Sequence, residues 1–220
     1  MKEDGAVRRE LQQTGKYMMK YGLAWGNSGN ISARIAEDRY VITASGTFMA
    51  ELDDHDLIEC DLEGNTFGVE GRKASKETPM HRAVYEERPE INAVLHASPF
   101  YSTLVAASSI EIPSNWFIES MYYLERVERV PYSHPGSEAL GEGVRGKAKS
   151  ANILLLDNHG VLVYDTSIRE ARMALHTLEM ACKMLIVSQS AGIEMKGLPN
   201  EVEQDFIVGA AYKPRRSWSM

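Results

Sequence analysis

Two short apolar segments in the last third of the chain constrain the fold most strongly. Residues 153–156 and 161–164 are continuous apolar runs, separated by the turn sequence 157–160. Runs of this length bounded by turn residues are typical of buried strands. The following segment, 167–190, repeats alanine, leucine and methionine at helical spacing on two faces. Two buried strands followed by such a helix predict a sheet with helices packed against it.

The same mixture of short strands and amphipathic helices continues along the rest of the chain. Strands are expected at 40–43, 57–61 and 93–96, and helices at 4–21, 75–87 and 99–107. Ser75 is a plausible N-cap for the helix 75–87. We find no internal repeat, low-complexity tract or linker in the sequence. We therefore expect one α/β domain over residues 1–220, with a topology that the pattern alone leaves open.

Charge and cysteine content exclude several classes of function. The chain has 31 acidic and 24 basic residues and a formal net charge of −7, so it lacks the basic surface of a nucleic-acid-binding protein. Its apolar runs fall short of the ~18 residues of a membrane span, and its start lacks the apolar segment of a signal peptide. Two isolated cysteines, Cys60 and Cys182, fit a reducing cytoplasm. Any metal must therefore be held by histidine and carboxylate.

Two histidines occupy positions suited to metal binding. His96 ends an apolar strand, and His159 lies in the turn between the two apolar runs. Neutral imidazole is a common ligand of zinc and similar ions, and strand ends hold such groups rigidly. The alternative interpretation is a pair of hydrogen-bonded structural histidines.

An acidic residue at the start of the helix 75–87 also has two interpretations. Glu77 is either a favourable charge at a helix N-terminus or a general base or metal ligand. His81 follows it by one helical turn, so the two face the same way. His81 either orients Glu77 or packs within the helix interface.

Three segments of small and polar residues suit an anion. The loops 27–30 and 43–46 carry hydroxyls, an amide and glycines beside strands, where several backbone N–H groups can face one anion. Neither loop matches a P-loop or dinucleotide-binding motif. Ser75 and Lys76 add a hydroxyl and a cation near a helix N-terminus.

Taken in order, these segments resemble the class II aldolase/adducin family, and within it the L-fuculose-1-phosphate aldolase type. The family's stretches occur here in its order and spacing: Gly26-Asn27-Ser28-Gly29-Asn30-Ile31-Ser32, Ile42-Thr43-Ala44-Ser45-Gly46, Ser75-Lys76-Glu77 with His81, Ala93-Val94-Leu95-His96, Val130-Pro131-Tyr132 and Asn158-His159-Gly160. One stretch would be a weak signal, whereas six in order are a specific one.

The resemblance implies a fold, a cofactor and a reaction. The fold is a three-layer α/β/α sandwich with a central, mainly antiparallel sheet, in a homotetramer with the active site at a subunit interface. The cofactor is a divalent metal, usually zinc, and the substrate is a small phosphorylated sugar or sugar acid. The reaction makes or breaks a carbon–carbon bond beside a carbonyl, through a metal-stabilised enediolate.

The resemblance also assigns roles to individual residues. Glu77 matches the acidic residue that shuttles the proton, and His96 and His159 match metal ligands. Lys76 stands where the family often has a second serine, and it could hold phosphate as a point charge. The predicted phosphate site comprises Ser28, Gly29, Asn30, Ser45, Gly46, Ser75 and Lys76.

One departure from the family concerns the metal. The family usually has two ligating histidines on the strand that ends at His96, but here the second position is Ser98. A catalytic zinc normally has three protein ligands. We therefore expect His134, four residues after Val130, as a replacement third ligand. The alternatives are that Glu77 or water completes the shell, that His134 acts as acid or base, or that the metal site is weakened or absent.

A second departure concerns proton donation. L-fuculose-1-phosphate aldolases use a tyrosine from the neighbouring subunit, and the corresponding position here is Phe117. Tyr122 and Tyr123 lie a little further on and either substitute for it or pack at an interface. The loss of the tyrosine gives weight to a related lyase reaction, the decarboxylation of a 3-oxo acid phosphate.

The sequence therefore predicts a metal-dependent lyase of the class II aldolase fold. A pentulose phosphate 4-epimerase is one alternative, although those relatives typically have aspartate at the position of Glu77. A non-catalytic adducin-like module is another, against which the retention of Glu77, His96 and His159 argues. An iron(II) oxygenase on the same scaffold is a third.

Overall fold

A central sheet organises the computed structural model, which describes residues 4–68, 71–214, 216 and 218. In that part of the chain the sheet has eight strands in the order β4-β3-β2-β1-β5-β8-β7-β6. Neighbouring strands are antiparallel except for the parallel pair β6–β7. The strands are β1 (Asn30–Arg34), β2 (Arg39–Thr43), β3 (Leu57–Asp61), β4 (Thr66–Phe67), β5 (Ala93–Ala97), β6 (Val127–Val130), β7 (Ile153–Leu156) and β8 (Gly160–Asp165).

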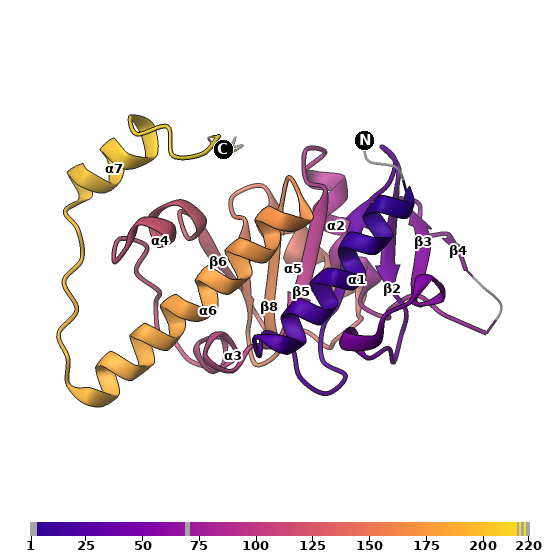
Figure 1. Cartoon of the computed structure of the whole chain (residues 1–220), viewed down its shortest axis with the longest axis horizontal. Coiled ribbons are helices and arrows are strands. Elements are labelled where there is room, and N and C mark those ends of the chain that lie inside the picture. The colour runs from indigo at the N-terminus through magenta and orange to yellow at the C-terminus, as the bar shows by residue number, and fades with distance from the viewer. Residues whose placement is uncertain (1–3, 69–70, 215, 217, 219–220) are drawn as a thin grey trace.

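Helices cover both faces of this sheet (Figure 1). One core joins Leu95 of β5 to residues of four helices: α1 (Asp4–Lys20), α3 (Phe100–Ala106), α4 (Ile118–Tyr123) and α6 (Ile168–Ala191). The other joins Val94 to two helices, α2 (Thr78–Glu87) and α5 (Glu138–Ala148). Adjacent residues of a strand point to opposite faces, so Val94 and Leu95 belong to separate cores. The predicted three-layer α/β/α sandwich with a mainly antiparallel sheet is confirmed.

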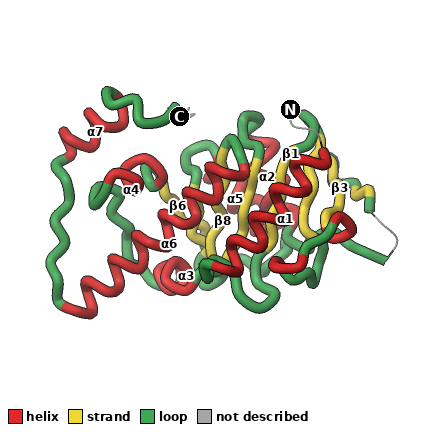
Figure 2. The backbone as a smooth tube through the Cα atoms, viewed as in Figure 1, coloured by secondary structure: helices red, strands yellow, loops and turns green. Residues whose placement is uncertain are grey.

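The remaining elements are short or lie at the periphery. Two 3-10 helices, η1 (Met49–Glu51) and η2 (Asp54–Asp56), precede β3. The helix α7 (Asn200–Val208) has no buried residue and lies beside α4, away from the sheet (Figures 1 and 2). Over the residues described, no helix combines the length and apolar character that crossing a membrane requires.

The start of α2 differs from the sequence prediction. The helix begins at Thr78 with Glu77 as its N-cap, rather than at Ser75. The Ser75 N–H donates to the Thr43 carbonyl at 3.1 Å, and Ala74 bridges Ala44. This segment therefore extends along the end of β2 before it turns into the helix.

Strand register brings several chain segments to one edge of the sheet. Asn30, at the start of β1, pairs with His96 near the end of β5. Ala97 pairs with Val161 at the start of β8, directly after the turn that carries His159. The strand ends therefore converge where the predicted site residues lie.

Candidate active site

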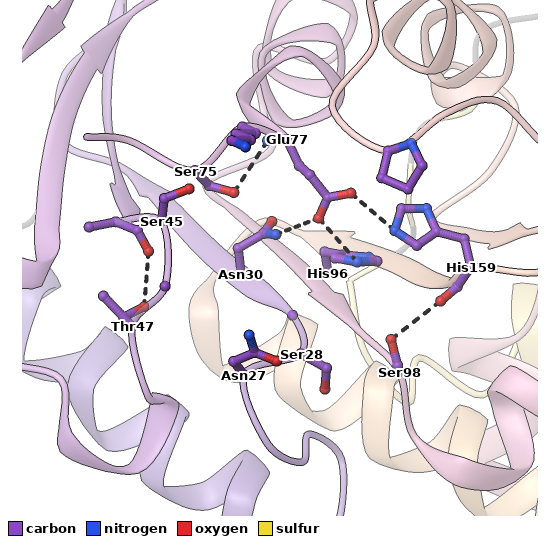
Figure 3. A pocket seen from close by; sticks show the side chains of 15 residues that line it. Asn27, Ser28, Asn30, Ser45, Thr47, Ser75, Glu77, His96, Ser98 and His159 are labelled. Carbon is purple, nitrogen blue, oxygen red and sulfur yellow. Dashed lines mark hydrogen bonds and ion pairs between the residues drawn. The ribbon is translucent and has the colours of Figure 1, made fainter. Parts of the chain in front are cut away.

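A cavity of about 360 Å³ opens at this edge (Figure 3). It brings together all the predicted site residues except His134. Its lining is Asn27, Ser28, Gly29, Asn30, Ala44, Ser45, Gly46, Thr47, Ser75, Lys76, Glu77, His96, Ser98, Pro135 and His159.

Three side chains converge in the cavity (Figure 3). The Nε2 atom of His96 lies 3.4 Å from Oε2 of Glu77, and Nε2 of His159 lies 3.0 Å from Oε1 of the same carboxylate. The two imidazole rings are 4.7 Å apart between centroids. One ligand atom from each residue lies within 4.8 Å of the others. The spacing of these three residues along the sequence does not indicate that the carboxylate lies between the two rings.

The backbone fixes the tautomer of His96. Its Nδ1–H donates to the Val161 carbonyl at 3.0 Å, so Nε2 carries a lone pair when the ring is neutral. Burial lowers the pKa of His96, and the Glu77 charge offsets only part of that effect. A neutral His96 therefore directs a lone pair at a carboxylate oxygen.

Glu77 is ionised in this environment. Burial alone would raise its pKa, but a hydrogen bond from His159 and favourable electrostatic interactions with His96 and His159 outweigh burial and lower the pKa to about 2. Asn30 Nδ2 also donates to Glu77 Oε2, at 2.7 Å. The site therefore holds an ionised carboxylate in contact with two imidazoles and one amide.

This donor set fits a divalent metal ion. A lone pair facing a carboxylate oxygen is unfavourable unless a cation lies between them. The buried Nδ1 of His159 has no hydrogen-bond partner among the described residues, so the ring proton can move to Nδ1 and leave a lone pair on Nε2 for an ion. Two imidazoles and one carboxylate are the ligands of several catalytic zinc sites.

The structure does not bring His134 into this cluster. Its side chain is exposed, its carbonyl accepts from Ser137 N at 3.0 Å, and the neighbouring Pro135 lines the cavity in its place. Ser98 does line the cavity, and its hydroxyl donates to the His159 carbonyl at 3.3 Å. Glu77 thus occupies the position near the imidazoles that the prediction gave to His134.

The aromatic residues expected near the reaction lie elsewhere in this chain. Phe117 is the N-cap of α4 and packs against the core on that face. The Tyr122 hydroxyl donates to the Pro214 carbonyl, and the Tyr123 hydroxyl donates to Glu170. None of the three lines the cavity.

The loops expected to hold phosphate surround the mouth of the cavity. Gly29 has φ +85°, and a Cβ there would lie 2.7 Å from the His96 carbonyl oxygen, so glycine is required for this close approach. Gly46 also has a positive φ, +78°. The Lys76 side chain is exposed at the rim. Loops of this kind can direct backbone N–H groups at one anion.

Sequence reasoning missed the role of the Asn30 side chain. The prediction gave Asn30 to phosphate, but its amide donates to Glu77 and accepts from His81. A signal was present in β1, where the polar Asn30 and Ser32 alternate with the apolar Ile31 and Ala33. Alternation places the polar pair on the face toward α2, which carries His81.

Comparison with known proteins identifies the family. Residues 9–186 match the model of the Class II Aldolase and Adducin N-terminal domain. The chain belongs to this family, and the predicted resemblance is confirmed. The family includes aldolases and decarboxylases, so the prediction of an enzyme of class II aldolase type is also confirmed. Class II aldolases use a divalent metal, in agreement with the donor set described above.

Individual relatives carry two different activities in their names. The chain is 32% identical to the 3-oxo-tetronate 4-phosphate decarboxylase of Haemophilus influenzae, over 90% of this chain and 98% of the relative. It is 27% identical to the L-fuculose phosphate aldolase of Escherichia coli, over 84% and 85%. Among solved structures, YgbL of Klebsiella pneumoniae matches with a TM-score of 0.85 and 26% identity, over 94% of this chain and all of that one. An L-fuculose 1-phosphate aldolase matches with a TM-score of 0.81 and 26% identity, over 92% and 95%.

Proposed function

We propose that this protein is a divalent-metal-dependent lyase that decarboxylates a small phosphorylated 3-oxo sugar acid. The observation that carries the proposal is the carboxylate of Glu77 between two imidazoles, inside a cavity rimmed by candidate phosphate loops. The name of the 32% identical relative supports this substrate class.

His96, His159 and Glu77 would hold the ion, with zinc as the proposed metal. A divalent ion bound there supplies Lewis-acid stabilisation of the charge that develops on the substrate's carbonyl oxygen. His96 is kept in the ligating tautomer by the Val161 carbonyl. This arrangement supports Glu77, rather than His134, as the third protein ligand of the free enzyme.

Glu77 is also the proposed acid/base. When the carboxyl carbon leaves as carbon dioxide, the electron pair of the broken bond remains on the neighbouring carbon, which must then gain a proton. Glu77 is the ionisable carboxylate among the cavity-lining residues, and we assign it the transfer of this proton from solvent to carbon. If a substrate oxygen took its place on a bound ion, the carboxylate would be free for this step.

The groups available for proton transfer favour decarboxylation over aldol cleavage. Aldol cleavage requires a group that takes the proton of a substrate hydroxyl, whereas carbon dioxide leaves without such a transfer. Phe117 has no hydroxyl, and the hydroxyls of Tyr122 and Tyr123 already donate to Pro214 and Glu170 of their own chain. Among the cavity-lining residues, this chain offers one carboxylate for proton transfer, which is enough for decarboxylation.

The phosphate is assigned to the rim. Ser28, Gly29, Ser45, Gly46 and Ser75 supply hydroxyls and backbone, with Lys76 as the added cation. Because the Asn30 amide is already hydrogen-bonded to Glu77 and His81, we place Asn30 behind the metal site instead.

We also propose a homotetramer with this cavity at a subunit boundary. Large aromatic side chains beside the site are exposed in the single chain: Trp25 is 61% and Phe100 69% exposed. Trp25 precedes the 27–30 loop, and its Nε1–H donates to the Ser98 carbonyl at 2.8 Å. Light scattering of the purified protein tests this state, and the cytoplasmic location stays a prediction.

Product analysis tests the reaction. The zinc-loaded protein is incubated with 3-oxo-tetronate 4-phosphate labelled with ¹³C at the carboxyl carbon, and we expect labelled carbon dioxide and dihydroxyacetone phosphate. Cleavage of a ketose 1-phosphate to an aldehyde, without decarboxylation, would instead establish the aldolase. Isomerisation without fragmentation would establish an epimerase.

A further inference from the structure

A chain of buried hydrogen bonds leads from Glu77 into the interior of the protein. Asn30 Nδ2 lies 2.7 Å from Glu77 Oε2, and Asn30 Oδ1 lies 2.6 Å from His81 Nε2. His81 Nδ1 lies 2.8 Å from Ser32 Oγ, which lies 2.8 Å from the Tyr85 hydroxyl. His81 and Ser32 are fully buried, and Asn30 is 6% exposed. The chain therefore connects the site to the core without passing through solvent.

Chemistry fixes the direction of each bond. An ionised carboxylate only accepts hydrogen bonds, so the amide nitrogen of Asn30 faces Glu77 and the amide oxygen faces His81. Burial lowers the pKa of His81 to about 3, so the neutral ring carries a single proton on Nε2 and accepts at Nδ1 from the Ser32 hydroxyl. Tyr85 in turn donates to Ser32. Only one tautomer of the neutral His81 ring is therefore consistent with its neighbours.

We propose that His81 is a positioning residue, which holds the Asn30 amide in the one orientation that donates to Glu77. The expected effect of His81 on turnover rests on the proposed function, whereas its effect on the hydrogen-bond pattern does not. The register of β1 and β5 places Asn30 directly opposite His96, so the same strand pair positions the amide and a candidate ligand. In the orientation that His81 holds, the amide binds Oε2 of Glu77. The other carboxylate oxygen, Oε1, then faces His159.

Loss of the His81 donor has a defined consequence. The Asn30 oxygen would be left buried without a donor, and the amide could rotate to direct that oxygen at Glu77. Two acceptors would then face each other, which displaces the carboxylate. Groups that orient metal ligands in this way typically change metal affinity or activity about 10- to 100-fold when mutated.

Substitution of His81 by leucine and by glutamine separates positioning from packing. His81→Leu removes both ring nitrogens, whereas His81→Gln keeps an N–H donor near the place of Nε2. His176→Leu is the matched control, because this histidine lies on a different helix, α6, outside the site, where its Nδ1 is hydrogen-bonded to the Tyr17 hydroxyl of α1. Its zinc affinity and turnover are expected within about twofold of the wild type, as for a residue outside the site.

The readouts are the zinc dissociation constant by calorimetry, kcat and KM, and the tautomer of His81 by ¹⁵N NMR. We expect His81→Leu to weaken zinc binding and lower kcat about 10- to 100-fold with KM nearly unchanged, and His81→Gln to recover most of both. In the wild-type protein we expect the proton on Nε2 of His81. The proposal would be overturned if His81→Leu had the same zinc affinity and kcat as His176→Leu. It would also be overturned if the proton of His81 were on Nδ1 in the wild type.

These readouts also separate the two proposals. If the wild type decarboxylates no 3-oxo acid phosphate, the proposed function fails, while zinc affinity and the NMR tautomer still decide the role of His81. If His81→Leu does not fold, the wild-type tautomer and His81→Gln decide it.

Discussion

Two charged clusters lie at opposite ends of β5 and β8, and their charge balance differs. At the end near Asp165, Arg216 Nη2 lies 2.6 Å from the Asp165 carboxylate, and Lys213 lies 2.6 Å from Glu170. Each carboxylate there has a cation beside it. At the other end, Glu77 is ionised and faces two imidazoles, of which His96 at least is neutral. The carboxylates of the first cluster are each paired with a lysine or an arginine, whereas Glu77 has neither beside it among the described residues.

The largest expected effect follows from removing the unbalanced charge. Glu77→Gln keeps the shape of the side chain and removes its proton transfer, so we expect kcat to fall about 10²- to 10⁴-fold. Thermal stability should stay within about 1 kcal/mol of the wild type or rise, because a buried charge is removed. Steady-state kinetics and calorimetry measure both. The control is Glu63→Gln, in an exposed turn, and equal kcat in the two variants would contradict the account.

The next effect concerns the ligands themselves. His159→Ala removes one of three proposed ligands, so bound zinc per chain after dialysis should fall well below that of the wild type. His134→Ala is the matched control and should bind as much zinc as the wild type, because its side chain is exposed outside the cavity. Elemental analysis of dialysed protein gives the result. Zinc lost from His134→Ala but retained by His159→Ala would restore the original hypothesis for His134.

At the balanced cluster the expected effect is on stability instead of activity. Arg216→Ala leaves Asp165 buried without its cation, since the two side chains are 6% and 5% exposed. We expect a loss of about 3 kcal/mol, or roughly 10 °C in Tm for a chain of this size. The fully folded variant should retain the wild-type kcat. Arg169→Ala, at an exposed position of α6, is the control. If the two variants had the same Tm, the Arg216–Asp165 ion pair would have no structural role.

The smallest expected effect is at the rim of the cavity. Lys76 is exposed, so its attraction for a phosphate is weakened by solvent, and we expect Lys76→Ser to raise KM about fivefold, or about 1 kcal/mol. Lys73→Ser lies on the same loop but does not line the cavity and should leave KM unchanged. The rise should shrink as salt is added. If neither Lys76→Ser nor Lys73→Ser changed KM, Lys76 would not belong to the phosphate site.

The sequence predicted those elements whose apolar pattern is simple. The strands β5, β7 and β8 each contain an apolar run, at 93–95, 153–156 and 161–164, and α1 and α6 have clear helical periodicity. The helix α5 was not predicted, because glycine at 141, 143 and 146 weakens a helix in isolation. In the fold two of these glycines permit close packing: a Cβ at Gly143 would lie 2.8 Å from Val130, and one at Gly141 would lie 3.1 Å from Pro79. Tertiary contact thus overrides the local preference.

The site was predictable to the level of its motifs and no further. The resemblance assigned His96, His159 and Glu77, but spacing along the chain does not show which way a side chain points. His134 was expected as a ligand to replace the histidine missing at Ser98. Its side chain is exposed outside the cavity, and Glu77, from a different element, lies against both imidazoles. The hydrogen bonds of Asn30 to Glu77 and His81 depend on the packing of β1 against α2, which the sequence pattern does not contain.

The most direct test of the account is the position of the metal itself. A crystal of the protein grown with equimolar zinc is measured on both sides of the zinc absorption edge. We predict one strong anomalous peak in the cavity, within coordination distance, about 2.0–2.2 Å, of Nε2 of His96, Nε2 of His159 and a carboxylate oxygen of Glu77. A peak on His134, or no peak in the cavity, would contradict the account.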